Sequence, residues 1–169
     1  PGELEAMRVA GLVVAHTLAR IRDAVSAGVT TAALDDIAAE SIRGEGATPS
    51  FLGYHGFPAH ICVSVNDEVV HGIPGPRILA AGDLVSVDCG AIVDGWHGDA
   101  AITVAVGDVT PDVAELSRIT EEALWAGLAA ASPGGRLSDI GHAVESRIRA
   151  AGDHYGIVED YVGHGIGSR

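Results

Sequence analysis

The amino-acid sequence predicts an α+β fold, and the strongest patterns behind this prediction are a β-hairpin and a repeated helical pair. Residues 84–106 alternate apolar and polar side chains on both sides of Asp94-Gly95, a dipeptide typical of two-residue hairpin turns because both positions need positive φ. A helix–glycine–helix pattern occurs twice, and a shift of 106 residues places Gly28 on Gly134 and Arg43 on Arg149. The chain is therefore predicted to contain two related αα–β halves.

The predicted elements follow from apolar periodicity and from the glycines and prolines that end each run. They are helices over 2–27 and 30–43, strands over 61–66 and 69–73, the hairpin over 84–106, helices over 110–131 and 138–150, and a strand over 155–162. The acidic residues of "ALDDIAAE" are expected on a solvated helix face. Because the first half leads into four strands and the second into one, we expect residues 1–169 to be a single domain whose C-terminal part is missing.

Composition narrows the class of protein. The 169 residues are 47% hydrophobic, which is enough for a sizeable core. Ten basic and 23 acidic residues give a net charge of −13 without a lysine or arginine cluster, which argues against nucleic-acid and membrane partners. Two cysteines without a disulfide framework, and no stretch long enough to span a membrane, favour a cytoplasmic protein.

The hairpin turn also predicts a strand register. If residues 94 and 95 form the turn, Asp88 lies opposite Ala101 and Asp99 lies opposite Gly90, so the two aspartates are diagonal neighbours on one face. The opposite face is apolar and is predicted to be core. Two adjacent carboxylates repel unless a cation or a proton lies between them. The pattern is consistent with a cation site, but the hairpin taken alone favours the solvated face of an ordinary antiparallel sheet, where acidic residues are common.

A histidine between glycines, His164 in "GHGIG", could provide a third ligand. Two carboxylates and one imidazole form a reasonable partial ligand set for Mn, Fe, Co or Zn. A Gly-His-Gly sequence is more often a simple turn, and "GHGIG" alone could also be mistaken for a phosphate-binding loop.

Taken in order, "EAMRVAG", "GYHGFP", "VNDEVVHGIP", "VDCGAIVDGWHGD" and "GHGIG" resemble the type I methionine aminopeptidases, which have the pita-bread fold. The resemblance implies an antiparallel sheet with helices on its outer face and a pseudo-twofold repeat, incomplete in its second half. It also implies roles for individual residues. The metal ligands would be Asp88, Asp99 and His164, and His71 would be the catalytic histidine that hydrogen-bonds substrate near the scissile amide. Tyr54, Phe57 and Cys62 would line a methionine pocket. Phe51 belongs to the same pocket and stands where relatives often carry a smaller residue.

The implied activity is metal-dependent removal of N-terminal methionine from peptides and nascent proteins whose next residue is small. The family uses two divalent ions (Co, Mn, Fe or Zn), which together carry four positive charges. The two aspartates neutralise only two of them. The family's two glutamate ligands would follow "GHGIG". This chain is therefore expected to hold at most one ion weakly and to be inactive or weakly active alone, with the missing C-terminal fragment as a possible partner.

Two alternatives remain open. The first is a non-catalytic pita-bread module that binds peptides or proteins. The second is a relative of the Xaa-Pro peptidases, against which "HGIP", "GYHGFP" and the short N-terminal segment argue.

Overall fold

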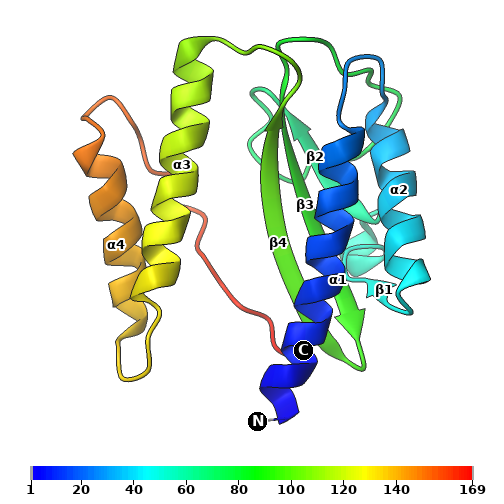
Figure 1. Ribbon diagram of the computed structural model, residues 1–169, viewed down its shortest axis with the longest axis horizontal. Coiled ribbons are helices and arrows are strands. Elements are labelled where there is room, and N and C mark those ends of the chain that lie inside the picture. The colour runs from blue at the N-terminus through cyan, green and yellow to red at the C-terminus, as the bar shows by residue number, and fades with distance from the viewer. Residues whose placement is uncertain (1, 169) are drawn as a thin grey trace. The chain divides into compact units, whose positions relative to one another are not determined.

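The computed structural model describes residues 2–168, which divide into two compact units. The first unit comprises residues 2–109 together with 165–168, and the second comprises residues 110–164. Figure 1 shows the elements of each unit in chain order. The expectation of a single domain stays a prediction.

The first unit is built around one long strand. Its elements are α1 (Gly2–Ala24), α2 (Thr31–Gly44), β1 (Thr48–Pro49), the 3-10 turn η1 (Tyr54–Gly56), β2 (Ile61–Val65), β3 (Leu84–Val93) and β4 (Trp96–Ala105). β3 pairs along its whole length with β4, and its other edge pairs with β2 and then β1. All of these pairings are antiparallel, which confirms the predicted sheet.

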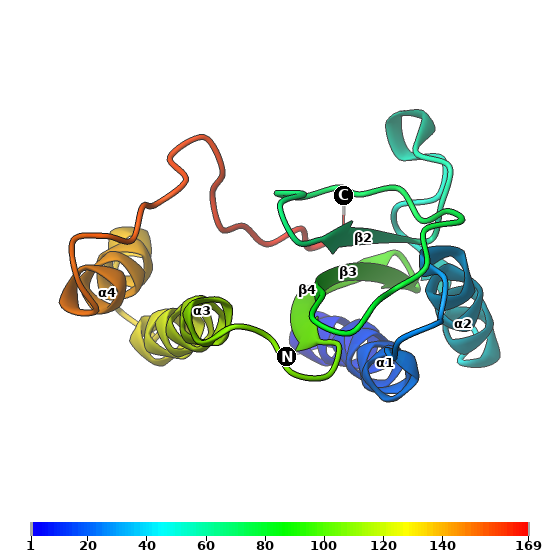
Figure 2. The same ribbon diagram turned by 90° about the horizontal axis from the view of Figure 1, so that it is seen from above.

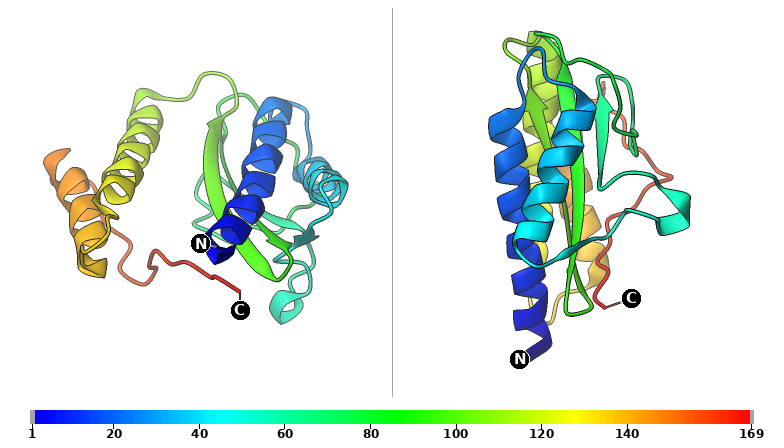
Figure 3. Two further views of the ribbon diagram at one scale, coloured as in Figure 1. Left: turned by 60° about the horizontal axis from the view of Figure 1, so that its bottom comes forward. Right: turned by 90° about the vertical axis from the view of Figure 1, so that its right-hand side faces the viewer.

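Both helices of this unit cover the same face of the sheet (Figure 2). The core between helices and sheet is made of small and branched apolar side chains, which include Val14, Leu18, Ile21, Leu34, Ile42, Ile61, Val63, Val65, Val85, Val87, Cys89 and Ala91. The β1–β2 loop and the loop after β2 lie on the opposite side of the sheet (Figure 3). One face of β3 therefore serves the core, and the other faces the loops.

A glycine in β4 lets α1 approach the sheet closely. A Cβ added at Gly98 would lie 2.6 Å from the backbone carbonyl of Ala10 in α1. Real Cβ atoms do not come so near to backbone, so the contact between α1 and β4 requires glycine at this position.

The second unit is a pair of packed helices, α3 (Pro111–Ala130) and α4 (Leu137–Ala150). They meet closely at Gly127, where an added Cβ would lie 2.8 Å from a methyl group of Val144. An ion pair between Glu122 and Arg147 joins the two helices.

The predicted repeat reappears in the helices. A shift of 106 residues carries the bounds of α2 onto those of α4 and the end of α1 onto the end of α3. The glycines of the two connections share the same left-handed conformation, with φ of 93° at Gly28 and 85° at Gly134.

Two predicted strands are wrong. Residues 69–73 are irregular, because His71 has φ of 59°, which an extended strand does not allow. Residues 155–162 are also irregular, and no strand in the described part of the chain pairs with them. The predicted helices are confirmed, although α1 ends at Ala24 rather than at residue 27.

Within residues 2–168, none of the helices has the length and apolar character needed to cross a membrane.

The contact at Gly98 gives a first testable prediction. Gly98→Ala should destabilise the chain by about 1–3 kcal/mol, because the added methyl group forces α1 away from β4. The free energy of unfolding in urea measures the effect. Gly11→Ala is the matched control, since Gly11 lies in α1 with open space around its Cβ position. That substitution should be neutral or stabilising by up to about 1 kcal/mol. Equal stability of Gly98→Ala and the parent chain would contradict the packing described.

Candidate functional site

The β3–β4 hairpin has the register that its turn predicts. Asp94 and Gly95 form the turn with φ of 49° and 82°, and Val93 pairs with Trp96. Asp88 consequently lies opposite Ala101, and Asp99 lies opposite Gly90. The two carboxylates are therefore diagonal neighbours on one face of the ladder, a placement that puts neighbouring side chains within about 7–8 Å of each other.

This face of the hairpin is polar and accessible. Asp88 is half-buried and Asp99 is exposed, whereas Val85, Val87, Cys89 and Ala91 on the other face of β3 are fully buried. Further along the same face, the hydroxyls of Ser86 and Thr103 are joined by a hydrogen bond of 3.0 Å. The helix-covered face holds the core, so the polar face is the one open to a ligand.

Cys62 adjoins the two aspartates. It lies directly opposite Asp88 in the pairing of β2 with β3, so its side chain is on the same face of the sheet as Asp88 and Asp99. We call this side of the sheet the aspartate face. Burial, followed by the negative charges of Asp88 and Asp99, raises the pKa of the Cys62 thiol to about 12. The same causes raise the pKa of Cys89, on the core face, to about 12. Both thiols are therefore protonated near neutral pH and are poor nucleophiles.

The β1–β2 loop brings an aromatic side chain to this face. A Cβ added at Gly90, opposite Asp99, would lie 2.9 Å from the ring of Phe51 and 2.8 Å from Cβ of Ser50. Phe51 thus packs over the hairpin beside Asp99, and glycine at position 90 leaves room for it.

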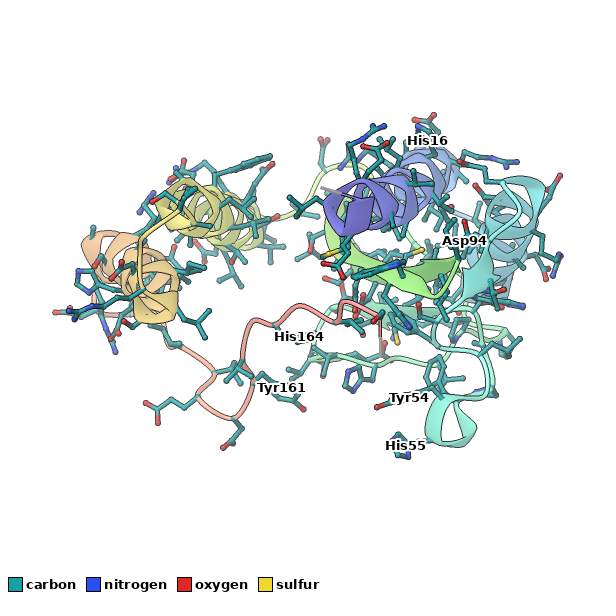
Figure 4. All side chains as sticks on the ribbon, turned by 90° about the horizontal axis from the view of Figure 1, so that it is seen from below. His16, Tyr54, His55, Asp94, Tyr161 and His164 are labelled. Carbon is teal, nitrogen blue, oxygen red and sulfur yellow. The ribbon has the colours of Figure 1, made fainter. Side chains whose placement is uncertain are left out.

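The rest of the predicted pocket lining is less enclosed. Phe57 is half-buried, whereas Tyr54 is 68% exposed and its ring contacts that of His55 edge to face at 4.4 Å. Figure 4 shows Tyr54 and His55 projecting from η1 into solvent. The structure therefore brings Phe51 and Cys62 to the aspartate face, but it does not enclose Tyr54 there.

His71 lies in the loop that follows β2. The next residue, Gly72, fixes this loop to β2: its N–H donates to Oγ of Ser64 at 3.1 Å, and its carbonyl accepts from Val63 N–H at 2.9 Å. A Cβ at Gly72 would lie 2.1 Å from the Val63 carbonyl oxygen. Ser64 points to the same face as Cys62, so Gly72 meets β2 on the side of the two aspartates, and the preceding His71 is exposed.

His164 belongs to the second unit, on the segment that follows α4 (Figure 4). Its position relative to Asp88 and Asp99 therefore stays a prediction. Within residues 2–168, no three or more His, Cys, Asp or Glu side chains are grouped as metal ligands. The two aspartates still fit part of a divalent-cation site, since the register makes their carboxylates diagonal neighbours on one face of the hairpin.

Sequence reasoning missed a half-buried pair, Asp35 and His60. One Asp35 oxygen accepts hydrogen bonds from the backbone N–H groups of His60 and Ile61, at 2.7 and 3.0 Å, and the other lies 2.7 Å from Nδ1 of His60. Asp35 thus holds the start of β2 and is not on a solvated helix face as predicted. The signal was its spacing of three and seven residues from the buried Ala38 and Ile42.

Sequence reasoning also left the role of His97 open. Its Nδ1 lies within hydrogen-bonding distance of Ser50 Oγ, at 3.1 Å, and its backbone N–H donates to the carbonyl of Gly167 at 2.9 Å. His97 thereby joins the β1–β2 loop and residues 165–168 to the aspartate hairpin.

Comparison with known proteins gives the family of the chain. Residues 5–169 match metallopeptidase family M24. Methionine aminopeptidase 1 of Mycobacterium tuberculosis is 57% identical over 98% of this chain, and the match covers 64% of that protein. Crystal structures of methionine aminopeptidases from Rickettsia prowazekii and Thermotoga maritima superpose with TM-scores of 0.94 and 0.95 at 40% and 38% identity. Each match covers 99% of this chain and 67% of the other.

The chain thus spans about two-thirds of the length of these relatives, with the α+β pita-bread architecture that the sequence predicts. The match runs through the hairpin that carries Asp88 and Asp99 and continues to the last residue. We conclude that this chain belongs to metallopeptidase family M24.

Proposed function

We propose that this chain carries the larger part of a metal-dependent methionine aminopeptidase, which removes N-terminal methionine when the next residue is small. The observation that carries the proposal is the aspartate face, where Asp88 and Asp99 lie diagonally beside Phe51 and Cys62. The 57% identity to a protein named methionine aminopeptidase supports the same assignment. The proposed substrates are the N-termini of peptides and nascent chains, and the proposed site of the reaction is the cytoplasm.

In this proposal, Asp88 and Asp99 would hold a divalent cation (Co, Mn, Fe or Zn), and His164 would be a third ligand of a set that is still partial. When bound, the cation supplies a Lewis acid that polarises the scissile carbonyl and anchors the free amino group. A second ion needs more carboxylates than these two, since two aspartates balance one divalent charge. The chain therefore holds at most one ion, weakly, and cleaves slowly or not at all by itself.

The remaining residues bind and orient the peptide. His71, held near β2 by Gly72, donates a hydrogen bond where negative charge develops at the scissile amide. Phe51 and Phe57 offer apolar surface suited to an unbranched thioether side chain, and the exposed Tyr54 contacts substrate only at the edge of that surface. Cys62 contributes a small neutral surface, because its raised pKa keeps the thiol protonated.

Cation binding is expected to depend on both aspartates of the hairpin. Asp88→Asn and Asp99→Asn should each lower the Mn²⁺ affinity by at least roughly 100-fold. Loss of a residue that only hydrogen-bonds to a metal ligand already costs up to about 100-fold in affinity, and loss of the ligand itself should cost no less. Isothermal titration of the chain with MnCl₂ measures the change. Asp94→Asn is the matched control, because it removes the same charge from the exposed turn of the same hairpin and asparagine accepts positive φ there. Undiminished Mn²⁺ affinity in both Asp88→Asn and Asp99→Asn would contradict the site.

Cleavage should follow the side chain at the peptide N-terminus and the size of its neighbour. With Mn²⁺ or Co²⁺ present, slow methionine release is expected from Met-Ala-Ser, and less from Met-Leu-Ser or Leu-Ala-Ser. Chromatography of the released amino acid provides the measurement. Release that continues in excess chelator would reject the proposed mechanism. Specific peptide binding with no release at all would favour the non-catalytic binding module.

Both thiols should be inert in the folded chain. Their pKa is raised from 9.0 to about 12, so at pH 8 the thiolate fraction falls by about three orders of magnitude. Iodoacetamide at pH 8 should leave Cys62 and Cys89 unmodified in the native chain and label both in urea, as mass spectrometry would detect. Rapid labelling of Cys62 in the native chain would contradict this prediction, because it would show that the thiol is less buried, or feels less negative charge from Asp88 and Asp99, than the structure indicates.

A further inference from the structure

The β1–β2 loop carries Phe51, whose ring lies over Gly90 beside Asp99. After Ser50 the chain leaves β1 and makes a tight turn in which Gly53, His55 and Gly56 all have positive φ. The turn closes on itself through hydrogen bonds such as Gly53 N–H to the Phe57 carbonyl at 2.8 Å. These local bonds set the shape of the turn, but they do not fix the loop to the sheet.

Ser50 makes the connection to the sheet. Its backbone N–H donates to the Gly90 carbonyl in β3 at 2.9 Å, and its Oγ is hydrogen-bonded to Nδ1 of His97 in β4 at 3.1 Å. The Ser50 side chain also packs over Gly90, beside the ring of Phe51. One residue thus reaches both strands of the hairpin immediately before the aromatic residue that covers it.

His97 is suited to receive this tether because it contacts two segments through different atoms. Its half-buried ring meets Ser50, while its backbone N–H donates to Gly167 at 2.9 Å. It shares a face with Asp99, two residues along β4. A side-chain substitution at His97 leaves the backbone bond to Gly167 available, so the ring's contribution can be tested alone.

We propose that Ser50 and His97 are positioning residues whose hydrogen bond holds Phe51 against the hairpin and so sets the fit of the pocket for a methionine side chain. This inference rests on the proposed function for its ligand, L-methionine. Neither residue touches the reacting atoms in this assignment. Their effect passes through Phe51, whose ring stands next to Asp99 at Gly90.

The test compares four single variants and one double variant of the full chain. Ser50→Ala and His97→Ala each remove the hydrogen bond, and Ser50→Ala/His97→Ala removes both partners. His97→Asn retains a polar group near the position of Nδ1 and serves as the conservative rescue. Ser86→Ala is the matched control, because the Ser86–Thr103 hydrogen bond has nearly the same length, 3.0 Å, on the same face and holds no loop.

Two measurements are made on each variant. The first is amide hydrogen exchange of residues 51–57, followed by mass spectrometry, which needs neither metal nor activity. The second is the Kd for L-methionine by isothermal titration. Ser50→Ala and His97→Ala should speed exchange in this loop and weaken methionine binding by roughly three- to tenfold, the equivalent of one hydrogen bond. The double variant should be no weaker than either single variant, His97→Asn should recover most of the affinity, and Ser86→Ala should match the parent chain.

Several outcomes would overturn the proposal. Unchanged loop exchange in both Ser50→Ala and His97→Ala would show that the hydrogen bond is no tether. Faster exchange with an unchanged Kd would show that the tether does not set the pocket. Additive losses in the double variant would assign the effects to separate causes. If the parent chain does not bind methionine, the proposed function fails for this chain, and the exchange result still decides for or against the tether.

Discussion

The two-residue turn at Asp94-Gly95 determines which side of the sheet each residue of β3 and β4 faces. Because side chains alternate along a strand, a register shift of one residue would bury Asp88 and Asp99 and expose Val87 and Cys89. The positive φ values at the turn and the continuous ladder from Val93–Trp96 to Leu84–Ala105 hold this register. The core, the aspartate face and the packing of Phe51 over Gly90 all depend on this register.

Features with local causes could be predicted from the sequence, and features with distant causes could not. The hairpin register and the four helices follow from turn chemistry and apolar periodicity within short windows. The loop at 69–73 looks like a strand by composition, but its conformation is set by the contact of Gly72 with β2. The role of Asp35 likewise appears only when α2 packs against the start of β2.

The same division applies to the candidate site. The placement of Asp88 and Asp99 could be read from one hairpin, because both lie within a few residues of its turn. The position of Phe51 could not be predicted in this way, since it depends on a hydrogen bond between Ser50 and His97 and on the missing side chain at Gly90. His164 lies in a different compact unit, so its role as a third ligand rests on the order of the motifs and stays a prediction.

The exposed Asp94-Gly95 turn has a consequence for the ageing of the protein. In an Asp-Gly dipeptide, the unhindered glycine nitrogen can attack the aspartate side chain to form a succinimide, which reopens mostly as isoaspartate. That product adds a methylene group to the backbone at the point where two residues must reverse the chain. Chemical damage at this exposed site would therefore disturb the alignment of Asp88 with Asp99 across the hairpin.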